Sequence, residues 1–241
     1  ASCVRFEPLG TKTGVPNQGT VAVAFSLVTC DGEGVFGLET DDLVIKENGD
    51  TLSSTESQST LIEGVDIKKE VYVTILLDNS PSVAANGALN DAVEGAKLFA
   101  TSLFENDSVN TFVSVAFFSK AFSIKQSFTN DSAKVFAAIS SLEDDTTGSN
   151  TTNLYGAMLQ ALDISTLNQE TRQESTNDGL LTVGELVVFT DGKDQAGLHS
   201  LGEIQNAVTN TNDGVTIISF GGEMAPDVLE SLGKSGSYVA D

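Results

Sequence analysis

Polar residues in three separate segments of the sequence carry side-chain oxygens that could bind a cation. Asp78, Ser80 and Ser82 alternate along one segment, so a turn there can direct all three side chains toward one point. Two later segments, Asn150-Thr151-Thr152 and Asp191-Gly192-Lys193-Asp194, also carry hydroxyls or carboxylates and stand next to apolar runs. Carboxylate and hydroxyl oxygens suit a hard cation, so this set favours Mg²⁺, with Mn²⁺ or Ca²⁺ as alternatives.

The segments that must position these residues have the patterns of strands and helices. The nearly continuous apolar run 71–77 precedes the first polar segment, as expected of a parallel strand covered on both faces. A second run, 185–190, precedes Asp191, and residues 154–162 after Thr152 carry apolar residues at helical spacing. Ligands of open parallel sheets bind beyond the carboxyl ends of the strands. We therefore expect the polar segments to meet at one edge of a sheet.

The order of elements predicts an α/β fold for residues 68–241, with a doubly wound, mostly parallel sheet of Rossmann-like type. Strand and helix patterns alternate through this part of the chain, as in βαβ units. Residues 169–178 are polar, so we expect a surface excursion there. The expected strands are 71–77, 111–118, 121–124, 185–190, 215–220 and 238–240, and the expected helices are 87–104, 132–142, 154–162, 201–208 and 226–232.

The first 67 residues have an alternating pattern of apolar and polar residues with turn signals, which predicts a small N-terminal antiparallel β-sandwich module. Apolar residues alternate with smaller or polar ones from Val21 to Leu27, as in a half-buried strand. The pair Asn48-Gly49 is a strong hairpin signal. We therefore expect two domains, residues 1–67 and residues 68–241.

Taken together, the three polar segments resemble the metal-ion-dependent adhesion site (MIDAS) of von Willebrand factor A (VWA) domains. The fragments that carry the resemblance are Asp78-x-Ser80-x-Ser82, Thr152-Asn153-Leu154-Tyr155 and Phe189-Thr190-Asp191-Gly192. It implies that the two serines and Thr152 coordinate the metal, and that the two aspartates orient waters or bind it. It also implies that a carboxylate of the partner completes the octahedron. Thr151 is the alternative to Thr152.

This resemblance covers residues 68–241, and the sequence departs from the family at its end. The family's final C-terminal helix is expected not to be included, because Asp241 directly follows the last predicted strand. Residues 1–67 resemble, more loosely, the β-module that precedes A domains in bacterial surface adhesins. That resemblance implies a module that presents the A domain away from the cell surface.

The two cysteines, Cys3 and Cys30, fit no metal-ligand spacing, and a single histidine in the chain argues against a zinc site. We predict a disulfide between them, which implies an oxidising compartment. Two buried thiols are one alternative. The other is a lipid anchor at Cys3 after removal of a leader, because Ala1-Ser2-Cys3 is similar to the end of a bacterial lipoprotein cleavage box.

The chain is strongly acidic, with 34 Asp and Glu against 12 Lys and Arg and a formal net charge of −22. This charge argues against nucleic acid or an anionic membrane surface as the partner. No apolar run approaches the roughly 20 residues of a membrane-spanning helix. A bound cation would reverse the sign locally at the predicted edge of the sheet, where we expect the acids Asp78, Glu143, Asp144, Asp145, Asp191, Asp194 and Glu223.

These features predict a cell-surface or secreted adhesion protein, periplasmic or on the outer surface if its source is bacterial. It would bind an acidic group of a protein or glycan partner through the cation. We predict no enzymatic activity, because the sequence places no base near Ser80 and metal hydrolases usually use more carboxylate or histidine ligands. The alternative is a structural or assembly subunit of a surface filament or envelope complex, with a metal site that is stabilising or occupied by a neighbouring subunit.

Overall fold

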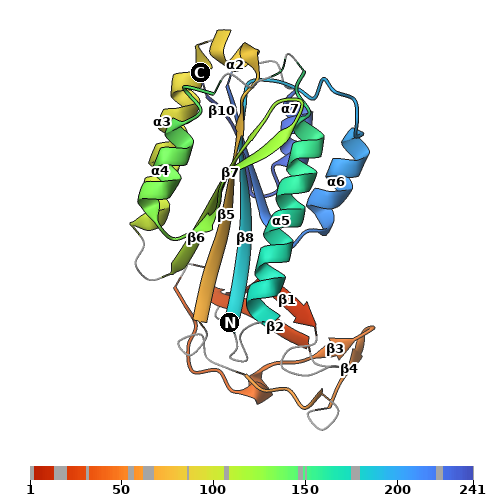
Figure 1. Cartoon of the computed structure of the whole chain (residues 1–241). Coiled ribbons are helices and arrows are strands. Elements are labelled where there is room, and N and C mark those ends of the chain that lie inside the picture. The colour runs from red at the N-terminus through yellow and green to blue at the C-terminus, as the bar shows by residue number, and fades with distance from the viewer. Residues whose placement is uncertain are drawn as a thin grey trace. The chain divides into compact units, whose positions relative to one another are not determined.

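The computed structural model of the chain, drawn in Figure 1, describes eleven stretches of residues and divides into two units. One unit comprises residues 1–68 with 178–181, and the other comprises residues 69–177 with 182–241. The described residues are 3–13, 21–30, 33–53, 57–61, 68–85, 87–105, 109–145, 149, 151–174, 180–220 and 225–240.

A six-stranded sheet with the order β10-β9-β8-β5-β6-β7 forms the centre of the larger unit. The pairs β5–β6, β8–β9 and β9–β10 are parallel, and the edge strand β7 runs antiparallel to β6. The predicted mostly parallel α/β sheet is thus confirmed. Its strands are β5 (Lys68–Asp78), β6 (Asn110–Phe118), β7 (Phe122–Thr129), β8 (Leu180–Thr190), β9 (Gly214–Phe220) and β10 (Gly236–Ala240).

Helices cover both faces of this sheet, with α3 and α4 on one side and α5, α6 and α7 on the other (Figure 1). Successive side chains of β5 point to opposite faces of the sheet. Val73, Ile75 and Leu77 therefore pack in the core beneath α3 and α4, whereas Leu76 packs in the core beneath α5, α6 and α7. The short helix α2 was not predicted. The helices are α2 (Pro81–Ala85), α3 (Ala88–Phe104), α4 (Ser132–Ser140), α5 (Leu154–Glu174), α6 (Leu201–Asn210) and α7 (Pro226–Leu232).

The strand order places a topological switch point between β5 and β8. The chain leaves β5 toward β6 on one side, whereas β8 lies on the other side of β5. Open α/β sheets bind their ligands in the crevice outside the carboxyl ends of the strands at such a point. Asp78 is the last residue of β5, and Asp191 directly follows β8. The fold therefore brings these two aspartates to the position where a ligand site is expected.

The prediction of a surface excursion was wrong for residues 169–174, because α5 continues to Glu174, and residues 175–178 lie outside the described residues. Its polar residues make specific contacts with the sheet. Arg172 donates from Nε and Nη2 to the two carboxylate oxygens of Glu70, at 2.9 and 2.8 Å. Gln169 is buried and donates to Asp213 at 2.8 Å. The polar residues of this last part of α5 thus include two, Gln169 and Arg172, that hold buried carboxylates.

The described part of the smaller unit contains two separate two-stranded antiparallel sheets, where we predicted a sandwich. The first pairs β1 (Val4–Thr13) with β2 (Val21–Thr29), and the second pairs β3 (Lys46–Glu47) with β4 (Asp50–Thr51). The turn between β3 and β4 is Asn48-Gly49, and both residues have positive φ, at 52° and 96°. Type I′ hairpin turns require this conformation, so the Asn-Gly prediction is confirmed.

Cys3 and Cys30 form a disulfide, which confirms the predicted bridge. The backbone supports it, because Cys30 N–H donates to the carbonyl of Cys3 at 3.2 Å. The bond uses the sulfur of Cys3, which is the atom that a lipid anchor would need. The structure therefore supports the disulfide over both alternatives, the free thiols and the lipidated Cys3.

We expect reduction of this disulfide to destabilise the smaller unit by about 3–4 kcal/mol, because the bond closes a loop between residues 27 positions apart. Urea unfolding with and without a phosphine reductant measures the change. A Cys3→Ser/Cys30→Ser variant is the control and should not respond to reductant. Two free thiols in the unreduced protein, detected by alkylation and mass spectrometry, would contradict the bridge.

A second expectation concerns the ion pair between Glu70 and Arg172. Glu70 is 4% exposed and also accepts a hydrogen bond from the Tyr72 hydroxyl at 3.1 Å. The contact with Arg172 is the main reason that the pKa of Glu70 lies below its ordinary value of 4.5. A lowered carboxylate pKa stabilises the fold above about pH 4.5, and this contribution is lost as the pH falls through the folded-state pKa.

Replacement of Arg172 by Met should therefore lower the urea midpoint at pH 7, and the difference from the wild type should shrink below about pH 4.5. Lys69→Met is the matched control, because Lys69 is an exposed base on β5, the strand that carries Glu70. If the difference between Arg172→Met and the wild type does not change with pH, Arg172 stabilises the fold by packing and not by its charge.

Candidate metal site

The first polar segment folds into a turn that is held by the Asp78 carboxylate. Asp78 Oδ1 accepts a hydrogen bond from Ser80 N–H at 2.9 Å, as in an Asx-turn. Pro81 then begins α2, where its fixed φ and missing N–H suit the first helical position. The turn brings the hydroxyls of Ser80 and Ser82 to 2.9 Å from each other. The alternation along the sequence thus becomes a cluster of oxygens.

Two hydrogen bonds join this turn to the segment after β8. Ser82 Oγ donates to Asp191 Oδ1 at 3.2 Å, across 109 positions of sequence. Thr190 Oγ1 donates to Asp78 Oδ2 at 2.6 Å. Asp78 and Asp191 are each 2% exposed, so both carboxylates are held away from solvent. The structure brings four of the five predicted residues, Asp78, Ser80, Ser82 and Asp191, into one hydrogen-bonded network.

Thr152 is linked to the same region through its backbone. Its carbonyl accepts hydrogen bonds from the N–H groups of Gln195 and Ala196, at 2.8 and 3.0 Å. The next residue, Asn153, donates its N–H to the carbonyl of Ser119, directly after β6. Thr152 is 3% exposed, whereas Thr151 is more accessible. The role of the Thr152 hydroxyl as a ligand, in preference to Thr151, stays a prediction.

Burial makes the Asp78 carboxylate costly to ionise. The pKa of Asp78 is raised to about 6, mainly by burial and to a smaller extent by the nearby Asp191 carboxylate. Hydrogen bonds from Thr190 and Ser80 act in the opposite direction. The hydrogen-bond donors of Asp78 are neutral, so they do not cancel its charge. A cation between the two carboxylates would supply the missing positive charge.

The donor set fits a hard divalent cation, because the clustered side chains offer two carboxylates and two hydroxyls. Among the described residues, no group of three or more His, Cys, Asp and Glu could hold a metal. That finding agrees with the chemistry of this set, in which hydroxyls take the place of further carboxylates.

Of the other five acids that we expected at this edge, two make separate contacts, two are exposed and one lies outside the described residues. Asp145 pairs with Lys125 of β7 at 2.6 Å. Asp194 accepts a hydrogen bond from the N–H of Tyr155 in the first turn of α5, at 3.2 Å. Glu223 lies outside the described residues. Glu143 and Asp144 are exposed, whereas Asp78 and Asp191 are buried in the network of the site.

Sequence reasoning assigned no role to Thr190, Ser119 or Asp194, although all three hold the motif loops. Thr190 was visible as the residue before Asp191, but its hydroxyl contact with Asp78 depends on the pairing of two distant strands. Ser119 accepts from Asn153 N–H through its carbonyl, and its hydroxyl accepts from Ser149 N–H at 3.0 Å. Neither contact has a signal in the sequence.

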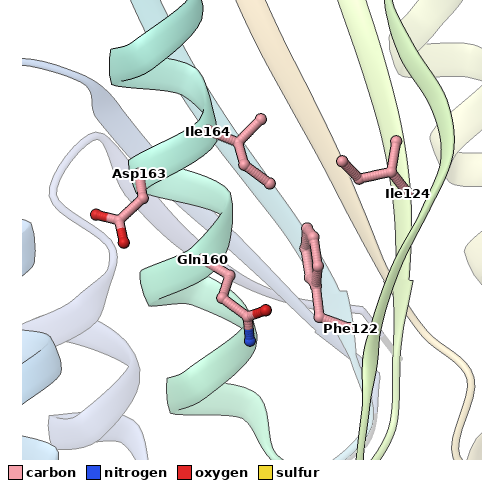
Figure 2. Close-up of a pocket in the computed structure, with 5 residues that line it drawn as sticks. All are labelled: Phe122, Ile124, Gln160, Asp163 and Ile164. Carbon is pink, nitrogen blue, oxygen red and sulfur yellow. The ribbon is translucent and has the colours of Figure 1, made fainter.

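A pocket between α5 and the edge strand β7 offers a different chemistry (Figure 2). Phe122 and Ile124 of β7 face Gln160 and Ile164 of α5, while the Asp163 carboxylate points away from the aromatic ring. The lining carries one acidic side chain and no hydroxyl. The oxygens that could share a cation therefore lie at the switch point rather than in this pocket.

Comparison with known proteins supports this assignment. Residues 73–193 match the family model described as the von Willebrand factor type A domain. The chain belongs to the von Willebrand factor type A family. The matched residues include the whole predicted set, from Asp78 to Asp191. No curated protein sequence shows a significant match to the chain.

Solved structures show the same fold at low sequence identity. The VWA domain of SpRpn10 is 13% identical with a TM-score of 0.51, over 70% of this chain and 87% of that domain. Proximal thread matrix protein 1 (PTMP1) from the mussel byssus is 17% identical with a TM-score of 0.55, over 73% of this chain and 44% of PTMP1. Another PTMP1 structure, 19% identical with a TM-score of 0.51, has a zinc-occupied MIDAS motif and is aligned over 73% of this chain and 43% of that one.

This VWA chain thus spans less than half the length of the mussel protein, and at these identities the likeness shows the fold alone. The zinc-occupied motif shows that a VWA relative holds a divalent metal at its MIDAS. Among the described residues of the present chain, no helix is long and apolar enough to cross a membrane.

A pair of threonine variants tests the network around Asp78. Thr190 and Thr74 are both buried, at 1% and 2% exposure. The Thr190 hydroxyl bonds to Asp78, whereas the Thr74 hydroxyl has no hydrogen-bond partner in the described part of the chain. Thr190→Val should lower the free energy of unfolding by about 1–3 kcal/mol, because it removes a donor from a buried carboxylate.

The control Thr74→Val should be neutral or stabilising, because it removes a buried hydroxyl that makes no hydrogen bond. Urea unfolding of the two variants and the wild type, all in a chelator, measures the difference. Equal losses in both variants would show that the bond between Thr190 and Asp78 contributes nothing to stability.

Proposed function

We propose that this VWA domain is a non-catalytic binding domain that captures an acidic group of a protein or glycan partner through a divalent cation. The observation that carries the proposal is the hydrogen-bonded network of Asp78, Ser80, Ser82 and Asp191 at the switch point of the sheet, in which both carboxylates are buried. We assign Mg²⁺ as the natural cation, with Mn²⁺ or Ca²⁺ as substitutes, because all the clustered ligand atoms are oxygens.

The predicted residues fall into two groups in this proposal, hydroxyls and carboxylates. The hydroxyls of Ser80, Ser82 and Thr152 coordinate the ion, and the carboxylates of Asp78 and Asp191 balance its charge from the side of the sheet. When bound, the ion supplies a positive centre that attracts a carboxylate. Neutral hydroxyls among the ligands leave more of that charge for the partner than an all-carboxylate set would.

The proposed location is the cell surface or the extracellular space. The disulfide between Cys3 and Cys30 supports it, because disulfides persist mainly in oxidising compartments. The net charge of −22 supports a partner that is neither nucleic acid nor an anionic membrane surface.

Thermal unfolding with added metal tests the proposal. Millimolar Mg²⁺ or Mn²⁺ should raise the melting temperature of the wild type, because a cation that binds only the folded state stabilises it. Asp78→Ala should remove this rise. Asp191→Asn should remove it too, and it should fold readily in a chelator because it relieves repulsion with Asp78. No metal-dependent shift in the wild type would overturn the metal site.

The matched control is Asp163→Ala, which removes one acid from the outer surface of α5 and should leave the metal response unchanged. Water proton relaxation of the Mn²⁺-loaded protein then tests partner access. A short peptide with a central glutamate should displace Mn²⁺-bound water, whereas the same peptide with glutamine should not. Equal effects of both peptides would contradict carboxylate capture and favour a metal that only stabilises an assembly.

A further inference from the structure

Residues 194–197, which follow β8, form a turn that bears on the position of Thr152. The turn contains one internal hydrogen bond and makes two more to the carbonyl of Thr152. The Asp194 carboxylate closes the turn, because its Oδ2 accepts from the N–H of Gly197 at 3.0 Å. Gly197 has a φ of 60°, a left-handed conformation that suits glycine. The closed turn directs the N–H groups of Gln195 and Ala196 at the carbonyl of Thr152, at 2.8 and 3.0 Å.

The same carboxylate also reaches the helix that Thr152 precedes. Asp194 Oδ1 accepts from the N–H of Tyr155, in the first turn of α5, at 3.2 Å. The side chain of Asn153 accepts from the next N–H, that of Gly156, at 3.2 Å. Asp194 therefore supplies an acceptor and a negative charge to the start of α5, which is favourable at a helix N-terminus.

We propose that Asp194 is a positioning residue of the metal site, which fixes Thr152 relative to Asp191. Both of its oxygens accept backbone N–H groups, one on each side of the gap between α5 and the segment after β8. Asp191 lies three residues before it on that segment, so one carboxylate ties the two loops that carry predicted ligands. Asp194 acts through Thr152 and is not itself a ligand.

This role rests on the proposed function, and it predicts a lower metal affinity when the Asp194 carboxylate is removed. Partners that orient metal ligands typically change metal affinity by about 10- to 100-fold when they are replaced. Asp194→Ala should weaken Mn²⁺ binding by that factor in calorimetry. Asp194→Asn keeps one acceptor oxygen but places an amide nitrogen where the other accepts, so its affinity should lie between those of Asp194→Ala and the wild type.

Asp131→Ala is the matched control. Asp131 also caps a helix with its carboxylate, accepting from Ala133 and Lys134 at the start of α4, and none of these contacts involves a predicted ligand. Its removal should leave the dissociation constant for Mn²⁺ within about twofold of the wild type. A loss equal to that of Asp194→Ala would overturn the proposal, because any lost helix cap would then suffice.

Amide hydrogen exchange in the absence of metal separates the possible outcomes. In Asp194→Ala, exchange at Gln195 and Ala196 should become faster than in the wild type, because the turn that aims them at Thr152 is no longer closed. Unchanged protection with weaker metal binding would make Asp194 a direct ligand and overturn the positioning role. Unchanged Mn²⁺ affinity in Asp194→Ala would also overturn it.

Two further results are informative. If Asp194→Ala does not fold, Asp194→Asn decides, and wild-type affinity in that variant would overturn the proposal. If the wild type binds neither Mn²⁺ nor Mg²⁺, the proposed function fails, and the positioning role fails with it. Binding by the wild type with unchanged affinity in both Asp194 variants overturns the positioning role alone.

Discussion

Burial of two neighbouring carboxylates is the constraint around which the larger unit is organised. Asp78 and Asp191 lie at the carboxyl ends of β5 and β8, and each is 2% exposed. Loss of water raises the free energy of the charged form, and proximity of the second carboxylate raises it further. A hydroxyl and a backbone N–H group donate to Asp78, and the Ser82 hydroxyl donates to Asp191, so these three contacts stabilise the carboxylates without adding positive charge. In the proposed function a cation balances these charges, and without it the two carboxylates repel each other.

The helix α5 extends from the loops near these carboxylates to the opposite end of the sheet, and hydrogen bonds hold the helix near both of its ends. Near its start, Asp194 and Asn153 accept N–H groups of the first turn, and Thr152 is held by the turn that follows Asp194. Near its end, Arg172 makes a two-pronged contact with Glu70 at the beginning of β5. The strand β5 thus contacts the helix through Glu70 at one end and carries the aspartate of the metal site at the other. Rigid anchoring of this kind keeps ligands on separate elements in register.

The sequence predicted most of the fold because the strands of the larger unit are apolar runs and the helices carry apolar residues at helical spacing. It failed where polar side chains of a helix make hydrogen bonds with distant elements. Residues 169–174 looked like a surface loop, since composition does not reveal that Gln169 and Arg172 meet Asp213 and Glu70. For the site, the alternation of Asp78, Ser80 and Ser82 and the apolar runs before them were sufficient to predict four residues that the structure joins. The roles of Thr190 and Asp194 could not be predicted, because each depends on a contact between elements that only the fold brings together.

In the proposed function, the net charge of the chain and the chemistry of its partner act in opposite directions. A chain of charge −22 repels an acidic partner at long range, yet the proposed contact is a carboxylate on a cation. The two effects operate over different distances, because the repulsion between exposed charges is screened within about 8 Å at physiological ionic strength. The attraction at the metal acts at contact, in a region where Asp78 and Asp191 are shielded from water. Repulsion should therefore slow the encounter, most strongly at low salt, while the metal contact determines how long the complex lasts. Such a division favours binding under conditions of high ionic strength, where the charge keeps the protein soluble but no longer keeps an acidic partner away.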